Sequence, residues 1–239
     1  MSLASPPVSP FADAEPRLKP ARRMTSATQV FEVLRLEIIA LRLPPGTAIQ
    51  DKALIERFQV SRTPVRNALI RLTELGLVDV FPQSGTFVSR IPIAAIPEAV
   101  LIRKALESIT VEKAALAATP ARMTSIDLAI GRQKAAAQVN DIDAFHEADE
   151  GFHAAIADLA GHPGLWSLLT QVKMQVDRAR RLTLPEVGRM ERIILQHLSI
   201  RDAIAARDAE AAKAQMIRHV STVIPDIEEL KDQFPNYFT

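Results

Sequence analysis

The sequence predicts a mainly α-helical protein in two parts. An N-terminal winged helix-turn-helix, with three helices and a β-hairpin wing, is followed by an all-α antiparallel helical bundle. Three short helical patterns and then two strand-like runs occupy residues 26–91. From about Pro97 onward, apolar residues recur at helical spacing almost without interruption. Aromatic residues make up only 5% of the chain, and alanine and leucine dominate, which suits a mostly helical protein.

Residues 61–75 are the segment around which the N-terminal part is organised. Ser61 is a favourable N-cap and Pro64 suits a first helical turn, so a helix should begin here. Its apolar stripe consists of Val65, Ala68, Leu69, Leu72 and Leu75. The opposite face carries Arg62, Thr63, Arg66 and Asn67. Such side chains can reach base edges or phosphates, which predicts a recognition helix for DNA. An ordinary surface helix with solvated charges is the alternative.

The segments on either side complete a winged helix-turn-helix. Upstream, a helical stripe covers residues 30–43, and a second short helix follows near residues 53–58. Downstream, the strand-like runs 77–81 and 85–89 are joined by a three-residue turn. Three helices and a hairpin in this order favour a DNA-binding module over an isolated surface helix.

Composition and charge narrow the function classes. The chain of 239 residues has no cysteine, which excludes a disulfide framework, a zinc finger and thiol chemistry. No apolar run approaches the roughly 18 residues that span a bilayer, so we expect a cytoplasmic protein with no membrane partner. Residues 1–92 hold 12 Lys and Arg against 8 Asp and Glu, whereas residues 93–239 hold 17 against 20. A basic N-terminal part fits phosphate contact at that end only.

The chain divides at its prolines and turn residues. The expected segments are a disordered tail (1–25), the winged helix-turn-helix (26–91), a linker (92–96), the helical domain (97–231) and a C-terminal tail (232–239). The expected helices of the bundle cover 97–118, 124–138, 141–160, 164–184, 187–206 and 208–231. No phosphate-binding glycine loop or nucleophile elbow occurs, so nothing indicates a nucleotide enzyme or a hydrolase.

Polar residues lie inside the apolar stripes of three of these helices. Asp149 and His153 are four residues apart on one face, while His197 and His219 lie within the stripes of two later helices. Such groups need partners, because burying them unpaired costs several kcal/mol. A divalent cation would satisfy all four, with zinc the first expectation and nickel or manganese the alternatives. Separate satisfaction of each group by a carbonyl, an arginine or a water is the competing hypothesis.

Two sets of motifs resemble a known family. Segments 43–47, 60–66 and 85–88 resemble the winged helix of the GntR family of bacterial transcription regulators. Segment 149–153, together with the later histidines and the Arg-x-x-Leu-Glu segment 103–107, resembles the FCD ligand-binding domain of the FadR branch of that family. The resemblance therefore implies a DNA-binding domain followed by an effector-binding domain.

The resemblance also implies a set of functional residues. In metal-binding members of the FCD branch, four matching positions hold the ion, and open coordination sites take a carboxylate of the effector. These positions are Asp149, His153, His197 and His219. His146 or Glu150 could replace one of them. The residues expected to contact DNA are Arg35, Lys52, Ser61, Arg62, Thr63, Arg66 and Gly85.

Arginines are the candidates for anchoring an anionic effector. Arg103 could hold a carboxylate with its guanidinium, or it could form an i,i+4 ion pair with Glu107 on the helix surface. At least one of Arg178, Arg180 and Arg181 is expected to line the effector site.

These features predict a homodimeric transcription regulator, more specifically a repressor. Its affinity for an inverted-repeat operator in double-stranded DNA would be controlled by a small organic acid bound at a divalent metal ion. A dimer is expected because two half-sites multiply the discrimination of one winged helix. A metal-dependent enzyme of the His/carboxylate type is the alternative, but it leaves the winged helix without a role, so we expect no enzyme. A regulator with a purely structural metal is the third hypothesis.

Overall fold

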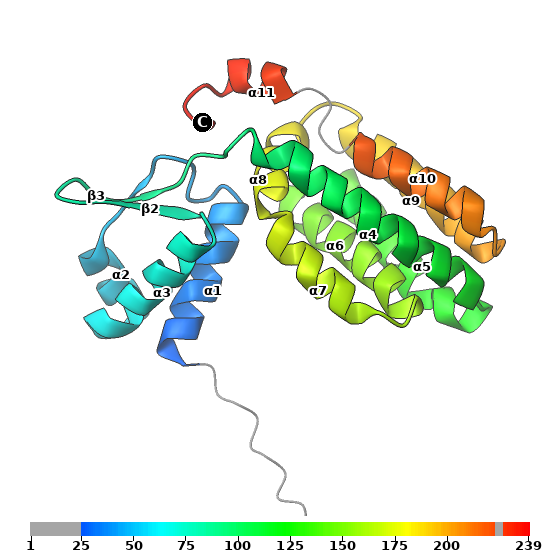
Figure 1. The fold of residues 1–239 in the computed structure, drawn as a ribbon, viewed down its shortest axis with the longest axis horizontal. Helices are drawn as coiled ribbons and strands as arrows, with labels where there is room; N and C mark the ends of the chain where they lie inside the picture. Colours follow the sequence, from blue (N-terminus) through cyan, green and yellow to red (C-terminus); the bar gives the residue numbers. More distant parts are fainter. Residues whose placement is uncertain (1–24, 223–226) are drawn as a thin grey trace, which may run out of the picture.

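The computed structural model describes residues 25–222 and 227–239, which form a winged helix-turn-helix beside an all-helical domain (Figure 1). The mainly α fold class expected from the sequence is confirmed. The tail expected to be disordered lies outside the described residues, except for Thr25, which caps the first helix. No helix in the described part of the chain is long and apolar enough to cross a membrane.

The first domain has three helices and a small antiparallel sheet. Its elements are α1 (Ser26–Ile39), β1 (Ala48–Ile49), α2 (Asp51–Phe58), α3 (Arg62–Glu74), β2 (Val78–Phe81) and β3 (Gly85–Val88). Strand β3 lies between β1 and β2 and pairs antiparallel with both. The predicted hairpin is therefore present, and β1 adds a third strand that is too short for its sequence pattern to indicate.

The core of this domain fixes which face of α3 stays outside. The apolar stripe of α3 is buried or half-buried against α1, whereas its N-terminal polar positions are exposed. Fully buried side chains here are Val30, Leu34, Ile38, Val65, Leu72 and Leu77. Full burial of one such aliphatic side chain contributes about 1.5–3 kcal/mol, so rotation of α3 about its axis would be costly.

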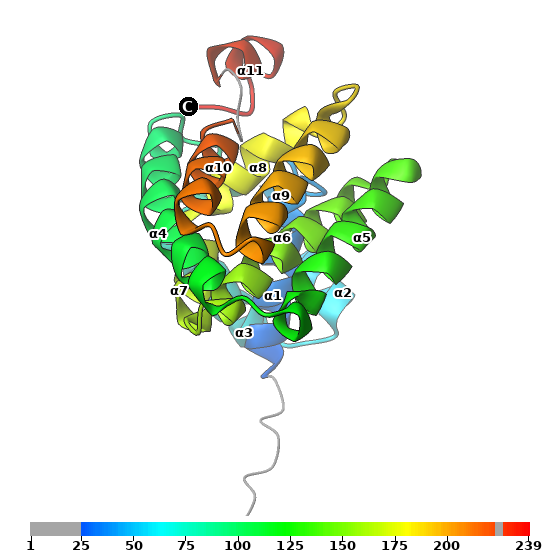
Figure 2. The same cartoon turned by 90° about the vertical axis from the view of Figure 1, so that its right-hand side faces the viewer.

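The second domain is a bundle in which α6 lies in the middle (Figure 2). Its elements are α4 (Ala95–Ala117), a 3₁₀ turn (Pro120–Met123), α5 (Thr124–Gln138), α6 (Ile142–Leu159), α7 (Pro163–Val172), α8 (Met174–Thr183), α9 (Arg189–Ala205), α10 (Ala209–Ser221) and α11 (Ile227–Gln233). Helix α4 packs along α10, and α5 packs along α6. Phe152 and Ile156 of α6, both buried, belong to the main apolar cluster of the bundle.

Several helix boundaries differ from those expected from the sequence, most clearly at α4 and at the two ranges 164–184 and 208–231. Helix α4 begins two residues early, because Pro97 falls in its first turn, where no backbone N–H is needed. The expected helix 164–184 is divided at Lys173 into α7 and α8. The expected helix 208–231 is also divided: α10 ends at Ser221, α11 starts at Ile227, and residues 223–226 lie outside the described part of the chain.

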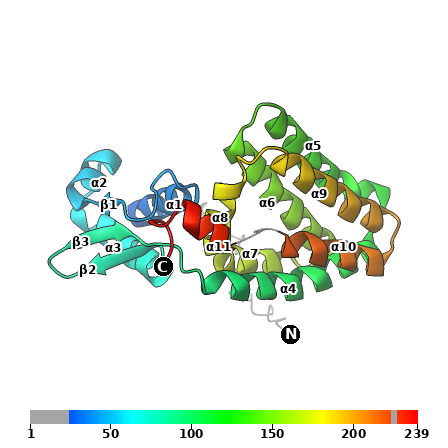
Figure 3. The same ribbon diagram turned by 90° about the horizontal axis from the view of Figure 1, so that it is seen from above.

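Helix α8 lies at the junction of the two domains (Figure 3). Met174, in its first turn, is buried in the apolar core of the winged helix. The amide of Gln175 donates to the carbonyl of Gly76 at 3.1 Å, and the buried guanidinium of Arg178 donates to the carbonyl of Ser89. One short helix of the second domain therefore contacts the first domain at three places: its apolar core, the turn that follows α3, and the end of β3.

The linker between the domains is covered by the C-terminal residues. Ile91 forms a parallel bridge with Phe238, in which Ile91 N donates to the carbonyl of Tyr237 at 2.8 Å and Thr239 N donates to the carbonyl of Ile91 at 3.0 Å. Ile91 and Phe238 are both buried, in an apolar cluster that includes Val176 of α8. The linker is thus packed against the same helix that joins the domains.

Candidate metal centre and nucleic-acid interface

Three imidazoles meet in the interior of the helical domain. His153 projects from α6, His197 from α9 and His219 from α10, and all three are buried. Each offers a ring nitrogen within 4.8 Å of those of the other two. The helical period explains the convergence, since each histidine occupies the buried stripe of its helix.

Glutamines fix the tautomers of the two later histidines. Nδ1 of His197 lies 2.9 Å from Oε1 of Gln133. Nδ1 of His219 lies 2.9 Å from Oε1 of Gln196. The amide nitrogens of both glutamines donate to other groups, so the amide oxygens accept from the Nδ1–H groups. Nε2 of His197 and Nε2 of His219 are then both unprotonated, and they lie 3.3 Å apart.

Glu107 orients the third histidine. Nδ1 of His153 lies 2.6 Å from Oε2 of Glu107, and Nε of Arg103 donates to Oε1 of Glu107 at 2.7 Å. Burial raises the pKa of Glu107, but Arg103 and His153 outweigh burial and lower it to about 2. Glu107 thus faces Nδ1 of His153, and Nε2 is the nitrogen of that ring that lies toward Asp149. Arg103 does form the i,i+4 pair with Glu107, but in the interior rather than on the helix surface.

Asp149 is the carboxylate beside these nitrogens. Its oxygens lie 3.7 Å from Nε2 of His197 and 4.0 Å from Nε2 of His153. Arg180 forks onto both oxygens, and Gln133 donates to Oδ1 at 3.3 Å. Burial raises the pKa of Asp149, but Arg180 outweighs burial and holds it well below its usual value. A carboxylate has about four lone-pair directions, so one on Oδ2 remains for a further partner.

This donor set fits a divalent cation. Three imidazoles and a carboxylate converge, and the unprotonated Nε2 atoms of His197 and His219 repel each other and the carboxylate when no positive charge lies between them. Burial lowers the pKa of His197 to about 3 and that of His219 well below its ordinary value. Both rings are therefore neutral at neutral pH, and a proton does not supply the positive charge. Imidazole nitrogens with a carboxylate are ligands that zinc, nickel and manganese accept in proteins.

A hollow of about 400 Å³ opens beside these groups. Its polar lining includes Arg180, Arg189, Arg192, Gln196, His219 and Thr222. No aspartate or glutamate of the described chain lines it. A small anion in this hollow would therefore reach both an arginine and the edge of the histidine cluster.

Helix α3 presents the polar face expected from the sequence. Ser61, Arg62, Thr63 and Arg66 are exposed, and Ser61 stands at the N-cap without a side-chain capping bond. Neither guanidinium takes part in an ion pair within the described residues. Gly85, at the start of β3, has φ of +115°, a conformation that side chains other than glycine rarely adopt. The exposed face and the wing are thus available to a partner.

The two remaining residues expected to contact DNA lie on other helices. Lys52 is exposed in the first turn of α2. Arg35 lies on α1, where it pairs with Glu32 at 2.9 Å and lines a groove that α6 and α8 also border. The side chain of Arg35, although it belongs to the winged helix, therefore lies at the junction of the two domains.

Two family models match the chain. The model described as bacterial regulatory proteins, gntR family, matches residues 26–88, and the FCD domain model matches residues 98–222. The chain belongs to the GntR family. This GntR-family regulator is 29% identical over 225 residues to the HTH-type transcriptional repressor RspR of Escherichia coli K12, which covers 94% of this chain and 98% of that protein.

Further comparisons agree with this assignment. The regulator is 35% identical over 217 residues, 90% of each chain, to an HTH-type transcriptional regulator in an unstable DNA locus of Streptomyces ambofaciens. The solved structure of E. coli McbR/YncC has the same fold, with a TM-score of 0.74 at 22% identity over 88% of this chain and 99% of that one. The protein is a DNA-binding transcription regulator of the GntR/FCD type, not an enzyme.

A second cluster of titratable groups in the regulator is built around a lysine. His146, Glu150 and Asp177 offer ligand atoms within 4.8 Å of one another. Nζ of the buried Lys173 lies 2.6 Å from an oxygen of Glu150 and 2.6 Å from an oxygen of Asp177. Its ammonium group supplies the positive charge there, so His146 and Glu150 group with Lys173 rather than with the three-histidine cluster.

Sequence reasoning missed the groups that orient the histidines. Gln133 and Gln196 look like ordinary polar residues of amphipathic helices, and the sequence offers Glu107 only as a surface partner of Arg103, one of the two roles open to that arginine. Among the three candidate arginines, Arg180 lines the hollow beside His219, whereas Arg178 donates to Ser89 and Arg181 pairs with an exposed aspartate. The only available signal was a buried stripe with polar members, which does not specify partners on other helices.

Acidification should destabilise metal-free protein through these imidazoles. The pKa of folded His197, about 3, lies below its ordinary 6.5, so the unfolded state binds more protons between these values. This contribution is full above pH 6.5 and falls by up to about 1.4 kcal/mol per pH unit as the pH drops toward 3. With chelator present, Tm should fall from pH 7 to pH 5.

The slope of Tm against pH should flatten in His197→Gln, and it should stay unchanged in His162→Gln, which replaces an exposed histidine. Equal slopes in both variants would contradict a neutral, buried imidazole at His197.

Proposed function

We propose that this regulator is a repressor that binds its operator as a homodimer and responds to a small organic acid at a divalent metal ion. The observation that carries the proposal is the convergence of three buried imidazoles, two of them with an unprotonated Nε2, beside the carboxylate of Asp149. Repression is supported by the name of RspR, to which the chain is 29% identical. The metal would be held by Asp149, His153, His197 and His219.

The DNA-binding part of the proposal rests on the exposed face of α3. Arg62 and Arg66 are free to fork onto guanine edges or phosphates, and Ser61 and Thr63 can add hydrogen bonds. Gly85 would let the wing backbone approach the duplex, and Lys52 would contact phosphates from α2. Arg35 would have to exchange its pairing with Glu32 for a phosphate, so it is the weakest member of the set.

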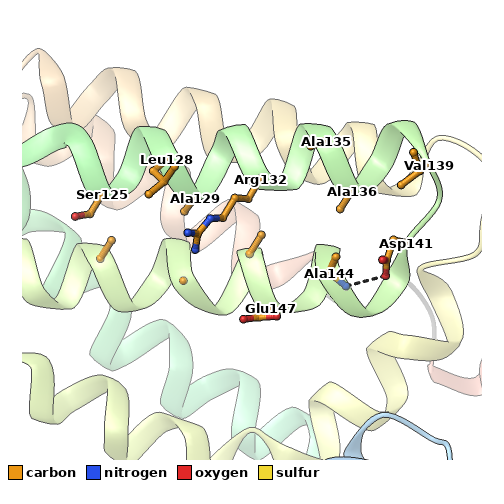
Figure 4. A pocket seen from close by; sticks show the side chains of 13 residues that line it. Ser125, Leu128, Ala129, Arg132, Ala135, Ala136, Val139, Asp141, Ala144 and Glu147 are labelled. Atoms are coloured by element: carbon orange, nitrogen blue, oxygen red, sulfur yellow. Dashed lines mark hydrogen bonds between the residues drawn. The ribbon is translucent and has the colours of Figure 1, made fainter.

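The surface between α5 and α6 supports a homodimer (Figure 4). Small side chains line a hollow of about 690 Å³ there, and Leu128 and Val139 beside it are 54% and 72% exposed. Arg132 of α5 and Glu147 of α6 border the hollow without an ion pair to any described residue. A face that carries both signs of charge is complementary to itself about a twofold axis, which matches an inverted-repeat operator.

Metal chemistry would serve binding rather than turnover. The ion would supply a Lewis-acidic position for an effector carboxylate. Arg103 would act through Glu107 and His153, because its guanidinium is already committed to that carboxylate. A purely structural metal remains the alternative, and the arginine-lined hollow beside His219 favours an effector over it.

The DNA interface is tested by removing its two free arginines. Arg62→Ala and Arg66→Ala should each cost about 1–3 kcal/mol of specific binding, because each removes a fork onto a base or phosphate. The measurement is fluorescence anisotropy with the operator that wild type selects from a random DNA pool. Arg201→Ala, at a half-buried arginine of α9 that pairs with Asp127, is the matched control and should bind like wild type. Wild-type affinity in the double variant would show that α3 does not read this DNA.

The metal centre is tested by elemental analysis. Purified protein should carry about one divalent ion per chain, and alanine at Asp149, His153, His197 or His219 should lower the content and the Tm gained on adding metal. His146→Ala, in the lysine-centred cluster, is the matched control and should keep its metal. Unchanged content in both His197→Ala and His219→Ala would place the ion elsewhere.

A further inference from the structure

His153 lacks the glutamine contact that fixes each of the other two histidines. Nδ1 of His197 and Nδ1 of His219 each lie 2.9 Å from a glutamine oxygen. Nδ1 of His153 lies 2.6 Å from Oε2 of Glu107, but neither of its ring nitrogens makes a hydrogen bond of normal geometry within the described residues. The charge contact with Glu107 determines which edge of the ring faces that carboxylate. The tilt of the ring has to be set by packing.

The indole of Trp166 packs against the face of this ring. Trp166 belongs to α7, and its ring is nearly parallel to that of His153, at an interplanar angle of 7° and a centroid distance of 5.3 Å. Such an offset stack is one of the arrangements that aromatic rings prefer. Phe152 and His197 meet His153 edge-on, at 83° and 88°, and the ring of His219 is inclined to it by 28°. Among these rings, only that of Trp166 matches the plane of His153.

Trp166 is itself restrained by a fixed cation. Nζ of Lys173 lies 5.4 Å from the centroid of the indole ring, and a cation over an aromatic face is attracted to it. Lys173 is buried, and its Nζ lies 2.6 Å from an oxygen of Glu150 and 2.6 Å from an oxygen of Asp177. Two carboxylates on other turns of the bundle therefore hold the ammonium group, and the ammonium group in turn restrains the indole.

We propose that Trp166 is a positioning residue of the metal centre. Its indole keeps the imidazole of His153 in the plane in which Nε2 lies toward Asp149, 4.0 Å from Oδ2. An ion bound at Nε2 withdraws electron density from the imidazole, so the ring is attracted more strongly to the electron-rich face of the indole. The stack is then stronger with the ion than without it, and it raises the affinity for the ion. This inference rests on the metal centre of the proposed function.

The test is the zinc affinity of metal-stripped, full-length protein, measured by competition with a chromogenic chelator. Trp166→Leu keeps an apolar side chain without an aromatic face. It should bind zinc at least about tenfold more weakly, since groups that orient metal ligands typically contribute about 10–100-fold. Trp166→Phe restores an aromatic face and should recover most of that loss. Ile204→Val, in the buried core of the bundle and on the same helix as His197, is the matched control. It should lower Tm but bind zinc as wild type does.

The indole also provides a spectroscopic readout, because Trp166 is the only tryptophan of the chain. Its emission should change as zinc is added to stripped wild type and level off at one equivalent. Unchanged emission at saturating zinc, or wild-type zinc affinity in Trp166→Leu, would overturn the inference and leave the metal centre standing. An equal loss of affinity in Trp166→Phe and Trp166→Leu would also overturn it. If wild type binds no zinc, the metal centre of the proposed function fails, and the inference fails with it.

Discussion

The buried ion pair between Arg180 of α8 and Asp149 of α6 is the interaction on which the rest of the helical domain depends. Both side chains are almost completely removed from water, at 2% and 1% exposure, and removing one partner of such a pair typically costs 3–5 kcal/mol. The pair therefore holds α8 against α6 and fixes Asp149 beside the three imidazoles. The surrounding polar groups are paired in the same way, since Gln133 contacts both Asp149 and His197, and Glu107 accepts from the buried Arg103.

Helix α8 connects this pair to the DNA-binding domain. Two residues before Arg180, Arg178 donates to the carbonyl at the end of the wing, and Met174 is buried among the apolar side chains of α1 and α3. The C-terminal residues pack the linker against the same helix. A ligand that changes the position of Arg180 would therefore move α8, and α8 contacts the winged helix directly. The effect would not depend on a flexible linker. The ligand can alter DNA affinity only by binding the DNA-competent and incompetent arrangements with different affinities.

The sequence predicted those features that depend on local periodicity. The stripe of α3 gave its exposed polar face, and the positions of His153, His197 and His219 within apolar stripes indicated that the three rings meet inside. What it could not predict depends on side chains far apart in the chain. Gln133 and His197 are 64 residues apart, and Lys173, where α7 and α8 divide, pairs with Glu150 on another helix. Such partners are determined by how the helices pack against one another. The spacing of residues within one helix does not determine that packing.

The central claim is that the metal centre controls DNA binding through α8. The direct measurement is operator affinity by fluorescence anisotropy, with and without an acid that binds, on metal-loaded and chelator-stripped protein. We expect the acid to weaken operator binding by about a hundredfold, or about 2.7 kcal/mol of coupling, only when the metal is present. Arg178→Gln, which breaks the contact to the wing, should bind the acid normally and show a smaller shift. An acid effect of equal size on stripped protein, or a full shift in Arg178→Gln, would contradict this account.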